Sequence, residues 1–131
     1  MKIVVIDGQG GKIGKTIIEQ LKAADSTSEV IAIGTNALAT AAMLKAGADN
    51  GATGENPVVI ASRTADVSVG PIGIIAADSM LGEITPKMAE AIGQSNAKKV
   101  LIPVSKCFEV AGVQDMPLSQ YVTEAVHMIL G

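Results

Sequence analysis

The fold of this chain is decided by the stretch Asp7-Gly8-Gln9-Gly10-Gly11-Lys12-Ile13-Gly14-Lys15-Thr16. The apolar, β-branched residues 2–6 precede it and are typical of a buried strand. Apolar residues at helical spacing run through its end and beyond it, namely Ile13, Ile17, Ile18 and Leu21. A glycine-rich loop between a strand and a helix is the setting in which backbone N–H groups and a helix dipole bind phosphate. We call residues 8–16 the glycine loop.

Two cations in the glycine loop point to an anion. Lys12 and Lys15 lie where a helix begins, and a cation there costs about 0.3–1 kcal/mol because of the helix dipole. The alternative is that both lysines are simply solvated on a tight turn. We predict a phosphate held by the residues Asp7, Gly8, Gln9, Gly10, Gly11, Lys12, Ile13, Gly14 and Lys15.

The loop matches two nucleotide motifs imperfectly. The dinucleotide fingerprint G-x-G-x-x-G would need glycine where Ile13 stands, although the frame Gly8-x-x-Gly11-x-x-Gly14 resembles a variant seen in some nicotinamide-dependent reductases. The P-loop pattern ends correctly in Gly14-Lys15-Thr16, but its first glycine falls on Gln9. NAD(P) or another nucleotide is therefore expected, without a choice between them.

Composition limits the class of protein. A chain of 131 residues makes one domain, and we expect a single nucleotide-binding domain over residues 1–131. The hydrophobic fraction is 48% and the aromatic fraction 2%, so the core is built from small residues and leaves apolar surface for a second subunit. We therefore expect a homo-oligomer.

Charge and cysteine content exclude several partners and sites. The net charge is −3 with no basic block, so neither nucleic acid nor a membrane is an expected partner. A single cysteine excludes an internal disulfide and favours a cytoplasmic location. With one histidine besides, no zinc-type ligand set and no catalytic triad with His as base can be assembled, and no metal site is predicted.

Alternating strand and helix patterns predict an α/β protein, a single-domain Rossmann-like three-layer sandwich. Its mostly parallel sheet has four or five strands in an order of about 3-2-1-4-5. The strands are expected at residues 2–6, 30–33, 66–70, 99–104 and 108–113, with the fourth near an edge of the sheet. Helices are expected to begin in the glycine loop and at residues 37–46, 85–94 and 117–130. Residues 49–57 read as a polar loop, 58–64 as either strand or helix, and 74–81 have no clear assignment.

Four segments should meet at the carboxyl edge of this sheet, where such folds bind ligands. They are the glycine loop and the residues Gly34, Thr35 and Asn36, then Gly70, Pro71 and Gly73, and last Ser105, Lys106 and Cys107. Thr35 and Asn36 stand where an acid usually binds a ribose, and they either bond the ribose or only cap a helix.

Other polar residues near this edge each have two interpretations. Asp7 either holds a magnesium-bound phosphate or a ribose, or accepts loop N–H groups and fixes the turn. Glu83 is an acid–base group or a first-turn acid, Lys106 an anion partner or a solvated lysine, and Cys107 a reactive or an inert thiol. Residues 53–56 are a lid or a plain loop, and His127 is expected on a solvent-facing helix surface.

The chain resembles a known family, the domain-of-unknown-function 3842 family of short bacterial proteins. The resemblance rests on the glycine loop, on Gly34-Thr35-Asn36-Ala37, Gly47-Ala48, Gly51-Ala52-Thr53-Gly54-Glu55-Asn56 and Gly70-Pro71-Ile72-Gly73, and on Ser79-Met80-Leu81-Gly82-Glu83-Ile84-Thr85-Pro86-Lys87-Met88-Ala89. It implies a stand-alone intracellular single-domain protein. It implies no activity, substrate or catalytic residue.

Three functions are open at this point. The first is a small cytosolic protein that binds a nucleotide or dinucleotide phosphate through the glycine loop. The second is a P-loop-like, magnesium-dependent phosphoryl transferase that uses Lys15, Thr16 and Asp7. The third is a non-catalytic oligomeric regulatory subunit. Whether the protein is an enzyme is left open, and no catalytic residue is assigned.

Overall fold

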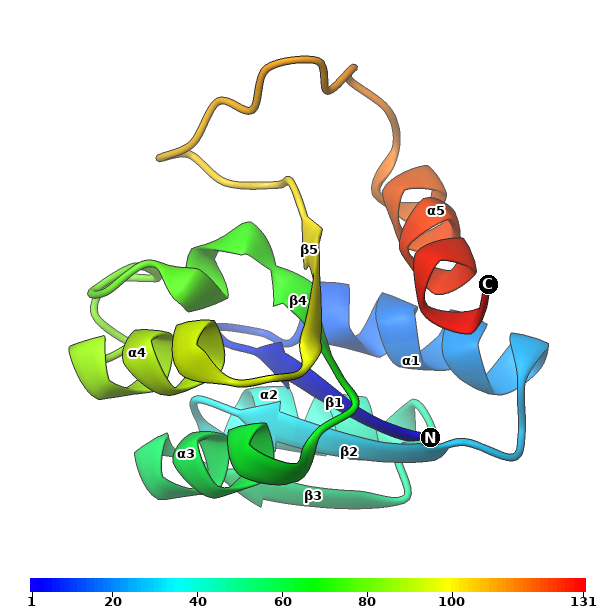
Figure 1. The fold of residues 1–131 in the computed structure, drawn as a ribbon, viewed down its shortest axis with the longest axis horizontal. Coiled ribbons are helices and arrows are strands. Elements are labelled where there is room, and N and C mark those ends of the chain that lie inside the picture. The colour runs from blue at the N-terminus through cyan, green and yellow to red at the C-terminus, as the bar shows by residue number, and fades with distance from the viewer.

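One parallel sheet of five strands forms the centre of the computed structural model, which describes residues 1–131 (Figure 1). The strands are β1 (Lys2–Asp7), β2 (Glu29–Gly34), β3 (Asn50–Thr53), β4 (Val67–Pro71) and β5 (Lys98–Ile102). Their order in the sheet is β3-β2-β1-β4-β5, and every neighbouring pair is parallel. The predicted α/β fold and the strand order 3-2-1-4-5 are confirmed.

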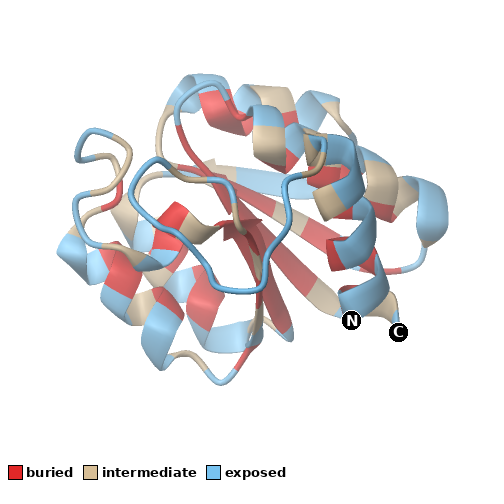
Figure 2. Ribbon diagram, turned by 90° about the horizontal axis from the view of Figure 1, so that it is seen from above, coloured by how far each residue is buried: buried red, intermediate tan, exposed pale blue.

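Helices cover both faces of the sheet. The helices α1 (Lys12–Ala24), α2 (Ala37–Lys45) and α5 (Leu118–Leu130) pack together on one face. The helices α3 (Glu55–Thr64) and α4 (Pro86–Gln94) pack side by side on the other, and the short 3₁₀ turn η1 (Ile72–Ile75) follows β4 on the way to α4 (Figure 1). Figure 2 shows the strands buried between the two helix layers, whose outer surfaces are exposed.

The central strand β1 belongs to both cores. Ile3 and Val5 pack with α1, α2 and α5, whereas Val4 and Ile6 pack with α3 and α4, as the two-residue period of a strand requires. All four side chains have no exposed surface. No helix of the chain combines the length and the apolar character needed to cross a membrane.

The strand order is right, but one strand was missed and another was placed beside the wrong neighbour. Residues 50–53, expected in a loop, form β3, and residues 66–70 belong to β4, which lies beside β1 rather than beside β2. The β3 sequence Asn-Gly-Ala-Thr lacks the β-branched, alternating pattern because this edge strand is mostly exposed. Residues 53–56 are divided between β3, Gly54 and α3, so they form neither the lid nor the plain loop considered for them.

Residues 108–113, expected as the fifth strand, form no strand. They lie in a long irregular connection, residues 103–117, which leaves β5 and arches over to α5 (Figure 1). We call this connection the 103–117 arm. Its apolar residues gave the strand signal, but Phe108, Val110 and Val113 are exposed and no neighbouring strand pairs with them.

The helix boundaries follow the predicted caps. The Asn36 side chain accepts a hydrogen bond from the Ala39 N–H, and Thr85 accepts one from the Met88 N–H, so both residues cap their helices. Residues 58–64, left open between strand and helix, are helical in α3. Residues 74–81 pass from η1 into an irregular segment that ends before α4.

The first prediction concerns the close approach of β4 to β1. A Cβ atom added at Gly70 would lie 2.2 Å from the Ile6 carbonyl oxygen, which is backbone and cannot move aside. We expect Gly70→Ala to lower the free energy of unfolding by about 1–3 kcal/mol in urea titrations. The matched control is Gly93→Ala in α4, where an added Cβ meets nothing within 4 Å. It should be neutral or slightly stabilising, and equal effects of the two changes would contradict the tight β1–β4 packing.

Candidate functional site

The Asp7 carboxylate ties the glycine loop together from inside. Asp7 ends β1 and is only 4% exposed. One oxygen accepts the Gly8 N–H at 2.8 Å and the other accepts the Gly14 N–H at 2.7 Å, across the first turn of α1. Burial raises the pKa of Asp7, while these backbone hydrogen bonds act to lower it. Asp7 thus fixes the turn, the second of the two roles considered for it.

A second carboxylate, that of Glu83, joins the glycine loop to the end of β2. Its Oε1 accepts the Gln9 N–H at 2.9 Å, the Thr35 hydroxyl at 2.5 Å and the Asn36 side-chain amide at 2.8 Å. The Asn36 amide also donates to the Gln9 carbonyl oxygen at 2.9 Å. Glu83 therefore stands in space where the sequence has no acid, at the carboxyl end of β2.

Two N–H groups of the glycine loop remain free. Those of Gly8, Gln9 and Gly14 donate to carboxylates, and that of Gly11 donates to the Gly8 carbonyl oxygen at 2.9 Å. The Ile13 N–H is directed at the Asp7 carboxylate and acts to lower its pKa. The N–H groups of Gly10 and Lys12 donate to no protein acceptor. Gly10 is exposed, and an added Cβ there would meet nothing within 4 Å. These two donors are the part of the loop that can bind an outside anion.

The irregular residues 76–83 cover the neighbouring part of the loop, and we call them the covering segment. Three of its non-glycine residues, Asp78, Met80 and Leu81, have left-handed backbone angles, with φ of 66°, 56° and 57°. Each such residue costs about 1–3 kcal/mol, so surrounding contacts must hold the segment in place. The hydrogen bonds of Glu83, and that from the Ser79 hydroxyl to the Gly73 carbonyl oxygen, supply those contacts.

A cavity of about 420 Å³ opens beside the glycine loop at the carboxyl ends of β1, β4 and β5. This place lies between β1 and β4, where the chain turns from one half of the sheet to the other, the usual ligand site of such folds. The glycine loop and the turn after β4 line one part of the cavity, and the covering segment and the start of the 103–117 arm line the rest. The lining residues are Asp7, Gln9, Ile13, Pro71, Gly73, Ser79, Met80, Leu81, Val104, Ser105, Lys106 and Cys107.

The structure separates the predicted site residues into three groups. Five line the cavity, namely Asp7, Gln9, Ile13, Pro71 and Gly73. The others of the loop are Gly8, which is covered, Gly11 and Gly14, which are buried, and Gly10, Lys12 and Lys15, which are exposed. Thr35 and Asn36 are bound to Glu83, and Gly70 is buried between strands.

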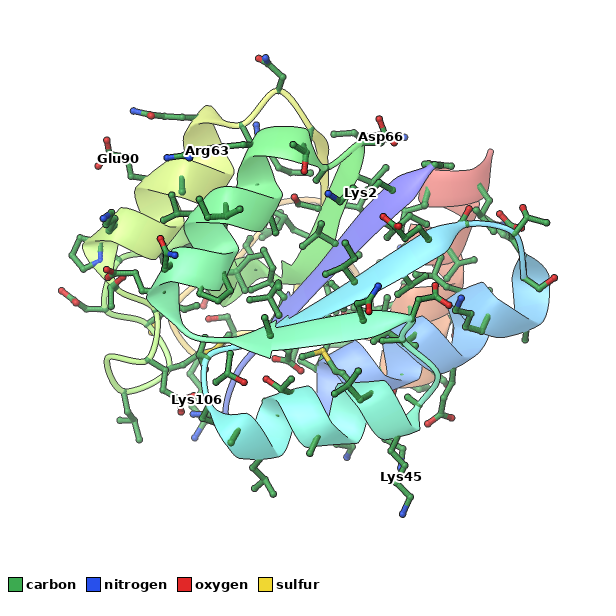
Figure 3. The ribbon with its side chains drawn as sticks, turned by 90° about the horizontal axis from the view of Figure 1, so that it is seen from below. Lys2, Lys45, Arg63, Asp66, Glu90 and Lys106 are labelled. Carbon is green, nitrogen blue, oxygen red and sulfur yellow. The ribbon has the colours of Figure 1, made fainter.

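Of the charged side chains considered, one lysine lines the cavity. Lys106 lines it, at the opposite edge of the sheet from Lys2 and Asp66, as Figure 3 shows. Lys15 lies 3.9 Å from Glu19 along the outside of α1, and the Thr16 hydroxyl donates to the Lys12 carbonyl oxygen of its own helix. Lys106 is thus the lysine of the cavity wall.

The remaining sequence candidates are placed plainly. Cys107 is an exposed free thiol on the cavity rim, and His127 faces solvent on α5 as expected. No three His, Cys, Asp or Glu side chains gather in a way that could hold a metal ion. Ser79, Met80, Leu81 and Val104 also line the cavity but were not predicted as site residues, because the irregular segments that place them have no periodicity.

The chain matches the family model described as "Domain of unknown function (DUF3842)" over residues 2–131. It belongs to this family. The comparison with curated proteins gave no match.

A solved structure shares the fold. It is the dodecameric FMN-dependent Ubix-like decarboxylase from Escherichia coli O157:H7, at 15% identity and a TM-score of 0.50. The similarity covers 98% of this chain and 76% of that one. At this identity the likeness is one of fold.

The pH dependence of stability tests the Glu83 network. Burial acts to raise the pKa of Glu83, but the hydrogen bonds from Thr35, Gln9 and Asn36 outweigh it and lower the pKa below the usual 4.5. The ionised group therefore adds stability above its unfolded pKa, and this contribution is lost as pH falls through the folded pKa. We expect the stability advantage of the native protein over Glu83→Gln to shrink between about pH 6 and pH 3.5 in urea titrations. A constant difference over that range would show that the carboxylate charge adds nothing to the network.

Proposed function

We propose that the protein binds a nucleotide, with its phosphate at the glycine loop and its base or ring in the adjoining cavity. The observation that carries the proposal is the pair of free N–H groups of Gly10 and Lys12 beside that cavity. Gly10 and Lys12 do not themselves line the cavity, but Gln9 and Ile13, which flank them in the sequence, do, so the free donors lie at its margin.

The charges and the lining suit such a ligand. Lys12 in the loop and Lys106 on the cavity wall favour an anion, and the positive end of the α1 dipole adds to this. Ile13, Pro71, Met80, Leu81 and Val104 offer apolar surface to a flat ring. The fold neighbour is described as FMN-dependent, which makes FMN one candidate beside NAD, NADP and other nucleotides.

The geometry gives less support to the phosphoryl-transfer hypothesis. That mechanism needs Asp7 and the Thr16 hydroxyl on a magnesium ion. Asp7 is instead buried on two loop N–H groups, and the Thr16 hydroxyl donates within its own helix. Nucleotide binding needs neither residue to be free, so it is the function we favour.

We also propose that the protein is a homo-oligomer, through the 103–117 arm. Val104, Phe108, Val110 and Val113 each expose about two-fifths of their surface on this arm. Figure 2 shows the exposed arm crossing in front of the molecule. A second copy would cover this apolar surface, and the fold neighbour is itself described as dodecameric.

Ligand binding is tested by crowding the free donors without disturbing the fold. Purified protein is screened by thermal shift with FMN, NAD, NADP, ATP, GTP and coenzyme A. A ligand at a hundred times its Kd stabilises by about 2.7 kcal/mol, or several degrees. Gly10→Ala should leave the melting temperature of the free protein unchanged, because an added Cβ meets nothing within 4 Å. It should raise the Kd of the nucleotide about tenfold, because the methyl group displaces the ligand phosphate from the Gly10 N–H.

The control for that experiment is Gly93→Ala, an equally open glycine far from the glycine loop, which should bind as the native protein does. If no nucleotide shifts the melting temperature of the native protein, nucleotide binding is refuted. If one binds and Gly10→Ala binds it equally well, the phosphate lies elsewhere.

The oligomer is tested by light scattering after gel filtration. The double change Phe108→Ser and Val110→Ser should lower the measured mass toward the 13.3 kDa of one chain, because polar side chains remove the apolar contact. Leu38→Ser on α2, where the leucine is also exposed, is the control and should leave the mass unchanged. A monomeric native protein would refute the interface.

A further inference from the structure

The two halves of the sheet's carboxyl edge differ in the room they leave for a ligand. A dinucleotide bound at such an edge reaches from one half to the other, with its phosphates over the glycine loop between them. Here the cavity lies only over β1, β4 and β5. The half over β2 is filled by the chain itself.

Glu83 fills the β2 half with hydrogen bonds. The three donors that a ribose or phosphate would use there, the Gln9 N–H, the Thr35 hydroxyl and the Asn36 amide, all converge on one Glu83 oxygen. Its negative charge also repels a second phosphate. None of Thr35, Asn36 and Glu83 lines the cavity.

Met80 closes the boundary between the two halves. A Cβ added at Gly8 would lie 2.8 Å from the Met80 sulfur, and one added at Gly73 would lie 3.6 Å from its Cε. The methionine side chain thus spans the ends of β1 and β4. At Gly8 the same added Cβ would also meet the Thr35 hydroxyl at 2.7 Å and Glu83 Oε1 at 3.0 Å. The bare backbone of Gly8 therefore serves this packing and is closed to a ligand on that side.

We infer that the ligand is a mononucleotide, seated on the β4–β5 half of the edge, and that Met80 and Glu83 exclude the second nucleotide of a dinucleotide. This inference rests on the proposed nucleotide binding. The cavity of about 420 Å³ lies toward the small end of ligand pockets, which span about 300–1,000 Å³, and this suits one nucleotide rather than two. Lys106 and the free Gly10 and Lys12 donors all lie on or beside this half.

Matched pairs of ligands test the inference. FMN and FAD, NMN and NAD, and AMP and diadenosine diphosphate each differ by one AMP unit. The Kd of every ligand is measured by isothermal titration calorimetry with the native protein. For whichever mononucleotide binds, the Kd of the partner dinucleotide should be at most about threefold lower than that of the mononucleotide, because the added half makes no new contact.

Variants then show what excludes the second nucleotide. Met80→Ala and Glu83→Ala each open the β2 half, and at least one should tighten the dinucleotide about tenfold relative to its mononucleotide. The ratio of the two Kd values is compared because Met80 also lines the cavity, so its loss can weaken both ligands. Glu83→Gln is the control, because its amide oxygen can accept the same three hydrogen bonds and only the charge is lost. The dinucleotide should therefore gain less affinity with Glu83→Gln than with Glu83→Ala. The melting temperature of each variant shows whether it is folded. If Glu83→Ala is unfolded, the test is made with Met80→Ala.

Each outcome decides the matter. A dinucleotide that binds the native protein ten times more tightly than its mononucleotide overturns the inference and leaves nucleotide binding intact. Variants that fold and leave the dinucleotide unchanged overturn the roles of Met80 and Glu83. No binding by any of the six ligands overturns the inference, whereas the proposed function is decided separately by the thermal-shift panel.

Discussion

The carboxylate of Asp7 is the constraint on which the site depends. It stands at the end of the central strand, buried on both sides, and holds the N–H groups of Gly8 and Gly14 at once. A buried charge of this kind is stable only when its hydrogen bonds are made, so the loop must wrap tightly around it. That wrapping starts α1 at Lys12, five residues after the end of β1. Everything that faces the carboxyl edge is positioned relative to this turn.

The same carboxylate decides which part of the loop is left for a ligand. A glycine loop with all its N–H groups free would be a broad anion cradle. Here Asp7 and Glu83 accept three of those groups, Asp7 also faces the Ile13 N–H, and the N–H groups of Gly10 and Lys12 donate to no protein acceptor. The anion site is therefore narrow and displaced toward the cavity. The accounting of N–H groups, rather than the number of glycines, describes what the loop can bind.

The elements that could be predicted from the sequence are those with a periodic apolar pattern or a recognisable helix cap. The buried run before Asp7, the caps at Asn36 and Thr85 and the amphipathic face of α5 all carry periodic or capping signals that follow from local chemistry. β3 was not predicted because an exposed edge strand needs no apolar pattern. Residues 108–113 of the 103–117 arm were wrongly predicted as a strand because exposed apolar residues give the same sequence pattern as buried ones.

The site was predicted unevenly for a similar reason. The glycine loop is recognisable from its residue types and their spacing, and five of the predicted site residues do line the cavity. The contact of Glu83 with Thr35 joins residues 48 positions apart, and nothing in local sequence reports it. The position of Met80 in the site could not be predicted either, because it depends on left-handed backbone angles that methionine rarely adopts. Tertiary contacts between irregular segments leave no periodic trace.

The cavity and the 103–117 arm are physically linked. Residues 104–107 form one wall of the cavity, and the exposed apolar residues begin directly after them. The arm has few hydrogen bonds. Backbone bonds join Val104 to Ile102 at the end of β5 and Val113 to Val110, and the Tyr121 hydroxyl of α5 donates to the Gln114 carbonyl oxygen at 2.6 Å. Phe108 and Val110 are exposed and open to a partner. A second copy bound there would fix Lys106 against the cavity, so assembly and ligand binding would each favour the other, as linkage requires of two events that order the same segment.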